Sequence, residues 1–155
     1  MRHPLALNQW LLAFLVGCAF FAGTGNASPV TIGQSFRLQS SVLKETREYQ
    51  VAVPADYAES DPNRFPVLYV LDGETHFVHT AAAAAFLEQN GEIPEVIVVG
   101  VTSTVRVRDF TQTDWPQVWV GGGGAARFKE FLASELIPTI ERRYRTNGFR
   151  ILSGH

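Results

Sequence analysis

The sequence predicts an α/β fold with a mainly parallel central sheet and flanking helices. Strands and helices alternate along most of the chain, which is typical of a sheet covered by helices on both faces. Two short apolar runs, 67–71 and 96–99, lack alternation and are rich in β-branched residues, as expected for buried parallel strands. The composition of the 155 residues, 46% hydrophobic and 18% charged, suits one globular domain.

Charge and cysteine content exclude several classes of protein. The formal net charge is −2, so the chain lacks the basic surface that phosphate binding requires, and nucleic acid is not expected as a partner. A single Cys excludes a small domain held together by disulfides. The oligomeric state stays open.

The first 27 residues read as a signal peptide. Arg2 is followed by an apolar run at 10–22, too short to span a bilayer comfortably, and then by small residues that suit cleavage after Ala27. We therefore expect residues 28–155 to form the mature domain. We expect the protein to be periplasmic or secreted.

Cys18 offers an alternative to soluble export. Residues 15–18 resemble the bacterial lipobox, in which the Cys is lipidated and becomes the N-terminus. Lipoproteins usually turn polar after this Cys, whereas here the apolar run continues to Ala22. A soluble form is favoured, and membrane attachment is expected only if Cys18 is lipidated.

The elements before residue 100 are predicted in this order. Strands are expected over 36–42 and 47–53, the second with regular alternation. A surface loop rich in turn formers follows at 54–63, and then comes the apolar strand at 67–71. An Ala-rich helix is expected over 80–90, ended by Asn90 and Gly91, before the strand at 96–99.

The rest of the chain adds a helix and a strand. Apolar residues recur at helical spacing over 125–144, and Pro138 should kink or split this helix because it lacks an N–H. A glycine run at 121–124 precedes it and suggests a flexible lid. The last strand is expected over 149–153. Because ligands bind at the carboxyl ends of parallel strands, sites are sought at 72–74, 100–103 and 154–155.

Ser153-Gly154-His155 has the form of the first half of a nucleophile elbow, Gly-x-Ser-x-Gly. In that motif a sharp strand-to-helix turn presents a Ser at the edge of the sheet. The Ser would directly follow His155, and His155 itself would not be the catalytic base. An ordinary loop after a buried strand is the alternative interpretation.

Five segments, at 47–54, 65–73, 108–111, 135–141 and 144–155, resemble the "putative esterase" family of α/β-hydrolases. This family is similar to esterase D, siderophore esterases, feruloyl esterases and the mycolyltransferases. The resemblance implies an exported serine esterase that hydrolyses a small-molecule carboxylic ester without a cofactor. Its Ser, acid and His would all lie beyond residue 155. The chain would then be the N-terminal part of an α/β-hydrolase domain, inactive as it stands.

The resemblance also implies one half of an oxyanion hole. In α/β-hydrolases one donor is a backbone N–H in the loop after the third strand, which corresponds here to Glu74, with Gly73 allowing close approach. A tight turn without a ligand is the alternative. Asp72 is expected to hold N–H groups of this loop rather than to act as the catalytic acid.

Several other side chains are candidates for weaker roles. His76, Phe77 and Trp115 are possible pocket residues. His76 and His79 are spaced to share a helix face, but no third ligand is nearby, so a metal site is not expected. Trp115 and Trp119 could line an aromatic pocket or cap the core. The segment 106–109 is expected to form an ion pair that organises its loop.

A second class of function stays open at this point. A non-catalytic binding protein could keep the α/β-hydrolase fold without the nucleophile. The residue that directly follows His155 distinguishes the two interpretations, because Gly or Ala there would favour a binding protein.

Overall fold

The structure is a computed structural model that describes residues 28–58, 62–117 and 121–154. The predicted signal peptide with Cys18, and also Trp119 and His155, lie outside the described residues. Residues 31–155 form one compact unit, distinct from residues 1–30, of which 28–30 are described and exposed. Among the helices that are described, none is long and apolar enough to cross a membrane.

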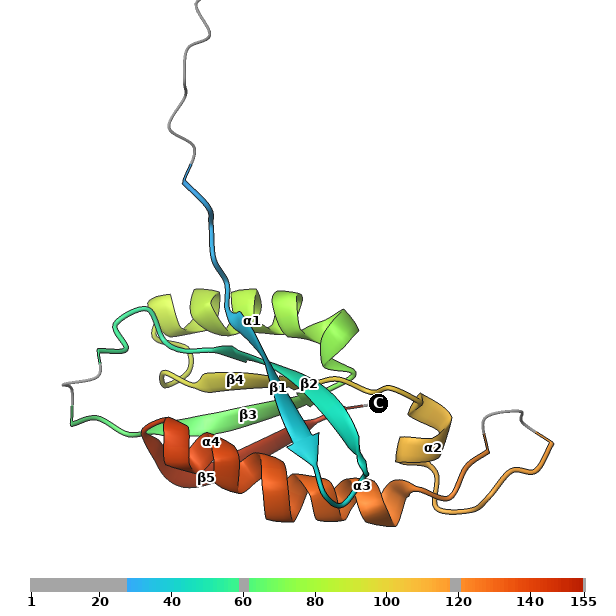
Figure 1. The fold of residues 1–155 in the computed structure, drawn as a ribbon. Coiled ribbons are helices and arrows are strands. Elements are labelled where there is room, and N and C mark those ends of the chain that lie inside the picture. The colour runs from blue at the N-terminus through green and yellow to red at the C-terminus, as the bar shows by residue number, and fades with distance from the viewer. Residues whose placement is uncertain (1–27, 59–61, 118–120, 155) are drawn as a thin grey trace, which may run out of the picture. The chain divides into compact units, whose positions relative to one another are not determined.

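The compact unit is built on a five-stranded mixed sheet (Figure 1). The strands lie in the order β1-β2-β4-β3-β5, with β1 and β2 antiparallel, β2 and β4 antiparallel, and the pairs β4/β3 and β3/β5 parallel. Their bounds are β1 Gln34–Ser40, β2 Glu45–Ala52, β3 Phe65–Leu71, β4 Ile97–Val101 and β5 Thr146–Ser153. The α/β class is confirmed. The sheet is mixed rather than mainly parallel, because the β1–β2 hairpin joins it through antiparallel pairing with β4.

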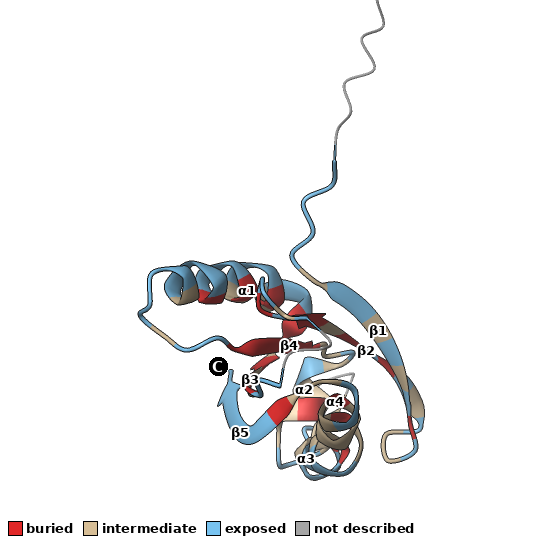
Figure 2. Ribbon diagram, turned by 90° about the vertical axis from the view of Figure 1, so that its left-hand side faces the viewer, coloured by how far each residue is buried: buried red, intermediate tan, exposed pale blue. Residues whose placement is uncertain are grey.

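Helices cover both faces of the sheet, as the alternating pattern predicts (Figures 1 and 2). On one face α1 (Gly73–Gln89) places Phe77, Ala81 and Ala84 against β3 and β4. On the other face the segments α3 (Ala125–Phe131), η1 (Leu132–Leu136) and α4 (Ile137–Arg143) place four apolar side chains on the same strands: Phe128, Phe131, Leu136 and Ile140. A short helix, α2 (Arg106–Phe110), lies between β4 and α3.

Helix α1 begins at Gly73, well before the predicted start at Thr80. Its N-cap is Asp72 in a left-handed conformation, and no side chain caps the first turn. Asp72 is itself a residue type that favours the N-cap, but several residues that follow it, among them Gly73, Thr75 and Val78, have low helix propensity. This explains why the alanine run at 81–85 marked the helix and its first two turns were not predicted.

Pro138 does not end its helix. The chain passes through a π-helical turn at η1 and continues into α4, with Pro138 in the first turn of α4. The N–H of Ile137 bonds to the carbonyl of Leu132, five residues back, as expected for a π turn. The helix was predicted to kink or split at Pro138. In the structure it widens locally into a π turn and continues.

Strand β5 is an exposed edge of the sheet (Figure 2). Along this strand Thr146 alone is buried, and Phe149, Ile151 and Leu152 are 63%, 42% and 62% exposed. Hollows of about 630 and 590 Å³ flank it on its two faces. The first is lined by Phe149 and Ile151, and the second by Leu152.

Candidate functional site

The chain leaves β3 and β4 toward opposite faces of the sheet. After β3 it enters α1 on one face, and after β4 it enters α2 and α3, whose apolar residues pack on the other face. Adjacent parallel strands that lead to opposite faces leave a crevice at their carboxyl ends, where α/β proteins bind their ligands. The candidate site lies at this edge.

The turn after β3 presents two backbone N–H groups for which the helix itself has no acceptor. Asp72 is 5% exposed and has φ 52° and ψ 46°, a left-handed conformation that Asp tolerates better than most residues. The N–H groups of Thr75 and His76 donate to the Asp72 carbonyl at 2.9 and 3.0 Å. The N–H groups of Gly73 and Glu74 precede these donors, so the helix offers them no acceptor. A helix N-terminus with two such donors can bind an anion or a developing oxyanion.

Gly73 is required by packing against the neighbouring strand. A Cβ atom at this position would lie 2.6 Å from the carbonyl carbon of Gly100 and 2.7 Å from the N atom of Val101. The start of α1 therefore touches the backbone of β4. The resemblance explained Gly73 by close approach of a ligand, whereas the contact in the structure is with β4, and the left-handed residue of the turn is Asp72.

The end of β5 lies beside this turn. In the parallel register Val70 pairs with Ser153, and a Cβ on Gly154 would lie 3.0 Å from Cδ1 of Leu71. A cavity of about 180 Å³ opens here, lined by Val70, Leu71, His76, His79, Thr80, Ser153 and Gly154. The turn at Asp72–Glu74 and the end of β5 are thus neighbours at one edge of the sheet. His155, the next residue of the predicted elbow, lies outside the described residues.

Two polar contacts tie the turn to the loop after β4. Nε of Arg106 donates to Oδ2 of Asp72 at 3.0 Å, and Oε2 of Glu74 accepts from the N–H of Ser103 at 3.1 Å. The prediction that the Asp72 side chain holds loop N–H groups is wrong. Its Oδ2 accepts from Arg106, and its Oδ1 has no hydrogen-bond partner in the part of the chain that the structure describes.

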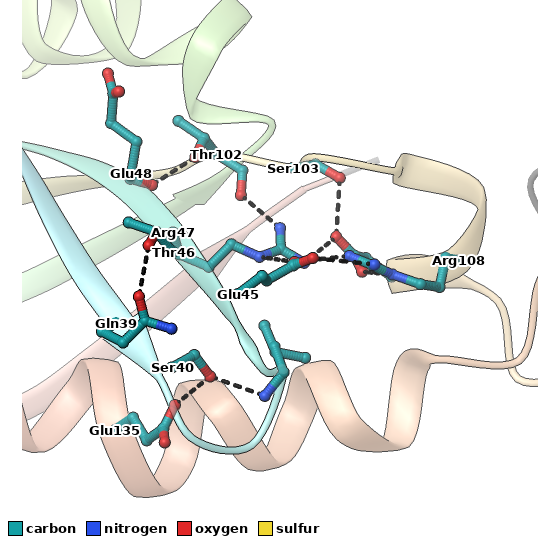
Figure 3. Close-up of polar contacts among 12 residues, drawn as sticks. Gln39, Ser40, Glu45, Thr46, Arg47, Glu48, Thr102, Ser103, Arg108 and Glu135 are labelled. Carbon is teal, nitrogen blue, oxygen red and sulfur yellow. Dashed lines mark hydrogen bonds and ion pairs between the residues drawn. The ribbon is translucent and has the colours of Figure 1, made fainter.

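A buried ion-pair network fixes the same loop to strand β2 (Figure 3). Arg47 and Asp109 are each 1% exposed, and an Nη of Arg47 lies 2.7 Å from Oδ2 of Asp109. Arg47 also donates to the carbonyl of Thr102 at 3.2 Å. Arg108 joins Asp109 at 2.9 Å and Glu45 at 2.8 Å. The ion pair expected within 106–109 is confirmed as Arg108–Asp109, and the structure shows it to be part of this larger network.

Sequence reasoning missed Arg47, although a signal for it exists. Because side chains alternate between the two faces of a strand, Arg47 lies on the same face of β2 as Tyr49 and Val51. All three residues are buried. A charged residue on the apolar face of an amphipathic strand indicates a buried partner of opposite charge. Asp109 could not be chosen as that partner from local spacing, because it lies 62 residues further along the chain.

The residues predicted to line a pocket lie in different parts of the structure. His76 and His79 line the small cavity, with ring centroids 5.1 Å apart. Phe77 is 5% exposed, packs against Gly100 in the core under α1 and does not line this cavity. Trp115 is 53% exposed and does not line the cavity. Within the described ranges no three His, Cys, Asp or Glu side chains gather closely enough to hold a metal ion.

The sheet order, the two helical layers and the crevice at the carboxyl edge define an α/β-hydrolase-like fold. Residues 40–155 match the family described as "Putative esterase", and the chain belongs to this family.

Named relatives and solved structures support this family assignment. The chain is 33% identical over 153 residues to the ferri-bacillibactin esterase BesA of Bacillus subtilis (strain 168), covering 86% of this chain and 52% of that protein. It superposes on an IroE-like serine hydrolase from Shewanella oneidensis with a TM-score of 0.74 and 45% identity, over 79% of this chain and 42% of that one. The BES protein from Bacillus cereus gives a TM-score of 0.70 and 25% identity, over 83% of this chain and 53% of that one. The chain therefore spans about half the length of these relatives.

Proposed function

We propose that the protein is a carboxylic ester hydrolase whose active site forms between the Asp72–Glu74 turn and the segment that continues β5. The β3–β5 register carries this proposal, because it brings Gly154 level with the turn that presents the N–H groups of Gly73 and Glu74. A residue placed directly after His155 would then stand within reach of an ester carbonyl held by these donors. We propose that this residue is the nucleophilic Ser.

The chemistry follows the serine hydrolase scheme. The Ser hydroxyl attacks the ester carbonyl carbon and passes its proton to a His, which returns it to the departing alcohol as the ester C–O bond breaks. Water then adds to the acyl-enzyme and releases the carboxylic acid and the Ser. The Gly73 and Glu74 donors would stabilise the negative oxygen in both steps, and one such donor is typically worth about 3 kcal/mol. The His and its acid partner would lie beyond residue 155.

The relatives favour a siderophore as the substrate. One relative is named a ferri-bacillibactin esterase, and it shares a third of its aligned residues with this chain. We propose that the protein hydrolyses ester bonds of an iron-carrying siderophore, with the iron as cargo of the substrate. We further propose that residues 1–27 direct export, so that the enzyme acts in the periplasm or outside the cell.

The second half of the protein would also complete the fold. The apolar side chains Phe149, Ile151 and Leu152 are exposed on both faces of β5, and an uncovered apolar edge strand favours aggregation. The relatives are about twice as long as this chain. We propose that their additional length corresponds here to a segment that covers β5 and carries the rest of the triad.

The test is hydrolysis by the complete protein of a short aryl ester and of ferri-bacillibactin. Activity on both, lost when the residue after His155 is changed to Ala, supports the proposal. Undiminished activity in that Ala variant contradicts the nucleophile assignment. Binding of the ferric substrate without hydrolysis would instead support a binding protein with this fold.

A further inference from the structure

Asp72 places a buried carboxylate next to the proposed oxyanion donors. Its side chain is 6% exposed, one oxygen accepts from Arg106, and the other has no hydrogen-bond partner among the described residues. It does not cap α1. A buried charge is costly unless it is paired, so a role for this carboxylate has to include its partner.

The charge of Asp72 opposes the chemistry proposed for the turn. Gly73 and Glu74, whose N–H groups would hold the oxyanion, follow Asp72 directly. A negative carboxylate this close repels a developing negative oxygen, and burial strengthens the repulsion because the local dielectric is low. A site of this kind needs a compensating positive charge.

Arg106 provides that charge from the neighbouring loop. Its Nε lies 3.0 Å from Oδ2 of Asp72, and its guanidinium lies 5.4 Å from the ring centroid of Phe110 on the same short helix. Helix α2 is itself fixed to β2 through Asp109 and Arg47. Arg106 is therefore held beside the turn by its own packing and by a buried ion pair at the other end of α2.

We infer that Arg106 is a positioning residue of the oxyanion turn, which offsets the charge of Asp72 and holds the left-handed backbone that presents Gly73 and Glu74. This inference rests on the proposed esterase function. Arg106 acts through Asp72 and not by contact with the substrate. Its effect is therefore expected in kcat rather than in KM.

The experiment compares four variants of the complete protein on a neutral aryl ester. Arg106→Gln is expected to lower kcat by about tenfold or more and to change KM by less than about twofold, since the lost interaction matters mainly in the transition state. Arg106→Lys keeps the charge and is expected to retain most of kcat. Asp72→Asn combined with Arg106→Gln is expected to recover most of kcat, because Asn tolerates the left-handed conformation and carries no charge. Arg150→Gln is the matched control: this Arg is ion-paired with Glu141 and similarly exposed, and its loss is expected to leave kcat unchanged.

Three results would overturn the inference. One is an Arg106→Gln enzyme as active as the Arg150→Gln control. Another is a rise in KM at constant kcat, which would make Arg106 a substrate-binding residue. The third is a double variant no more active than Arg106→Gln alone. An inactive wild-type protein that also fails to react with a serine-directed fluorophosphonate would refute the esterase function, and with it this inference.

Discussion

At the residue scale, the site depends on close contacts that ordinary substitutions would break. Gly73 allows α1 to touch the backbone of β4, and Arg47 and Asp109 form a pair that is almost completely buried. The sequence pattern indicated Gly73 through its motif. The alternation of β2 also indicates that Arg47 lies on the buried face. The surroundings of the Asp72 carboxylate could not be predicted. Among the described residues its Oδ1 has no hydrogen-bond partner, and which oxygen is paired depends on which distant Arg reaches the carboxylate.

Changing Gly73 to Ala should damage both stability and activity. The added Cβ would meet backbone atoms of Gly100 and Val101 that cannot move aside, and overpacking of this kind costs about 1–3 kcal/mol. Because the clash displaces the donor turn, kcat should fall as well. Gly91→Ala is the control, since a Cβ there meets nothing within 4 Å although its φ of 72° strains the backbone. It should lower stability by about 1 kcal/mol and leave kcat unchanged, as urea unfolding and initial rates would show. Equal kcat for the two variants would contradict this account of the turn.

Removing Asp109 should be one of the most damaging single changes. Asp109→Ala removes the buried carboxylate that pairs with Arg47 and leaves Glu45, which lies 2.7 Å from Nε of Arg47. The destabilisation should therefore reach at most the about 3–5 kcal/mol that is typical of a broken buried ion pair. The exposed pair Arg150–Glu141 serves as a comparison, because Glu141→Ala should cost less than about 1 kcal/mol. Chemical denaturation of both variants measures the difference. A small effect at Asp109 would mean that the network does not hold the loop after β4.

At the element scale, the π turn η1 links the second helical layer to the β1–β2 hairpin. Glu135 lies in this turn, and its carboxylate accepts from Oγ of Ser40 at 2.5 Å (Figure 3). It also accepts from the N–H groups of Ser41 and Val42 at 2.8 and 3.1 Å. Burial alone would raise the pKa of Glu135, but the hydrogen bonds from Ser40, Val42 and Ser41 and the nearby charge of Lys44 lower it on balance. The carboxylate thus fastens the hairpin to the helix.

This contact predicts a pH-dependent stability. A carboxyl group whose pKa is lowered by folding stabilises the protein above its ordinary value of 4.5 and loses that contribution as the pH falls through the folded value. Glu135→Gln should therefore be less stable than wild type at pH 7, and the difference should shrink as the pH falls below 4.5. Glu130→Gln, at an exposed position of the same helical layer, is the matched control. Unfolding free energies at several pH values test this. A constant difference between Glu135→Gln and wild type would contradict it.

Elements with strong local patterns were predicted well, and those set by distant contacts were not. Strands β3 and β4 were found because buried apolar runs have few alternatives. The beginning of α1 was missed because Gly73, Thr75 and Val78 in its first two turns have low helix propensity, and α2 was missed because five residues carry too little periodicity. Antiparallel pairing of β2 with β4 made the sheet mixed, and no local pattern encodes which strand becomes the neighbour of another.

At the scale of the whole molecule, the fold brings together the described parts of the proposed site. The donor turn, the loop held by Arg47 and Asp109, and the end of β5 converge at the carboxyl edge of the sheet. The predicted elbow at Gly154 and His155 remains a prediction, because His155 lies outside the described residues. The candidate oxyanion residues Gly73 and Glu74 were predicted from the family resemblance. The structure adds that their turn lies beside the end of β5.

The most direct test of the central claim is to map the residue that a fluorophosphonate probe modifies in the complete protein. After labelling and proteolysis, peptide mass spectrometry locates the adduct. Modification of a Ser directly after His155, lost when that residue is changed to Ala, is the result this account predicts. An adduct at any other position, or none in a protein that hydrolyses esters, would contradict an active site formed between the Asp72–Glu74 turn and the end of β5.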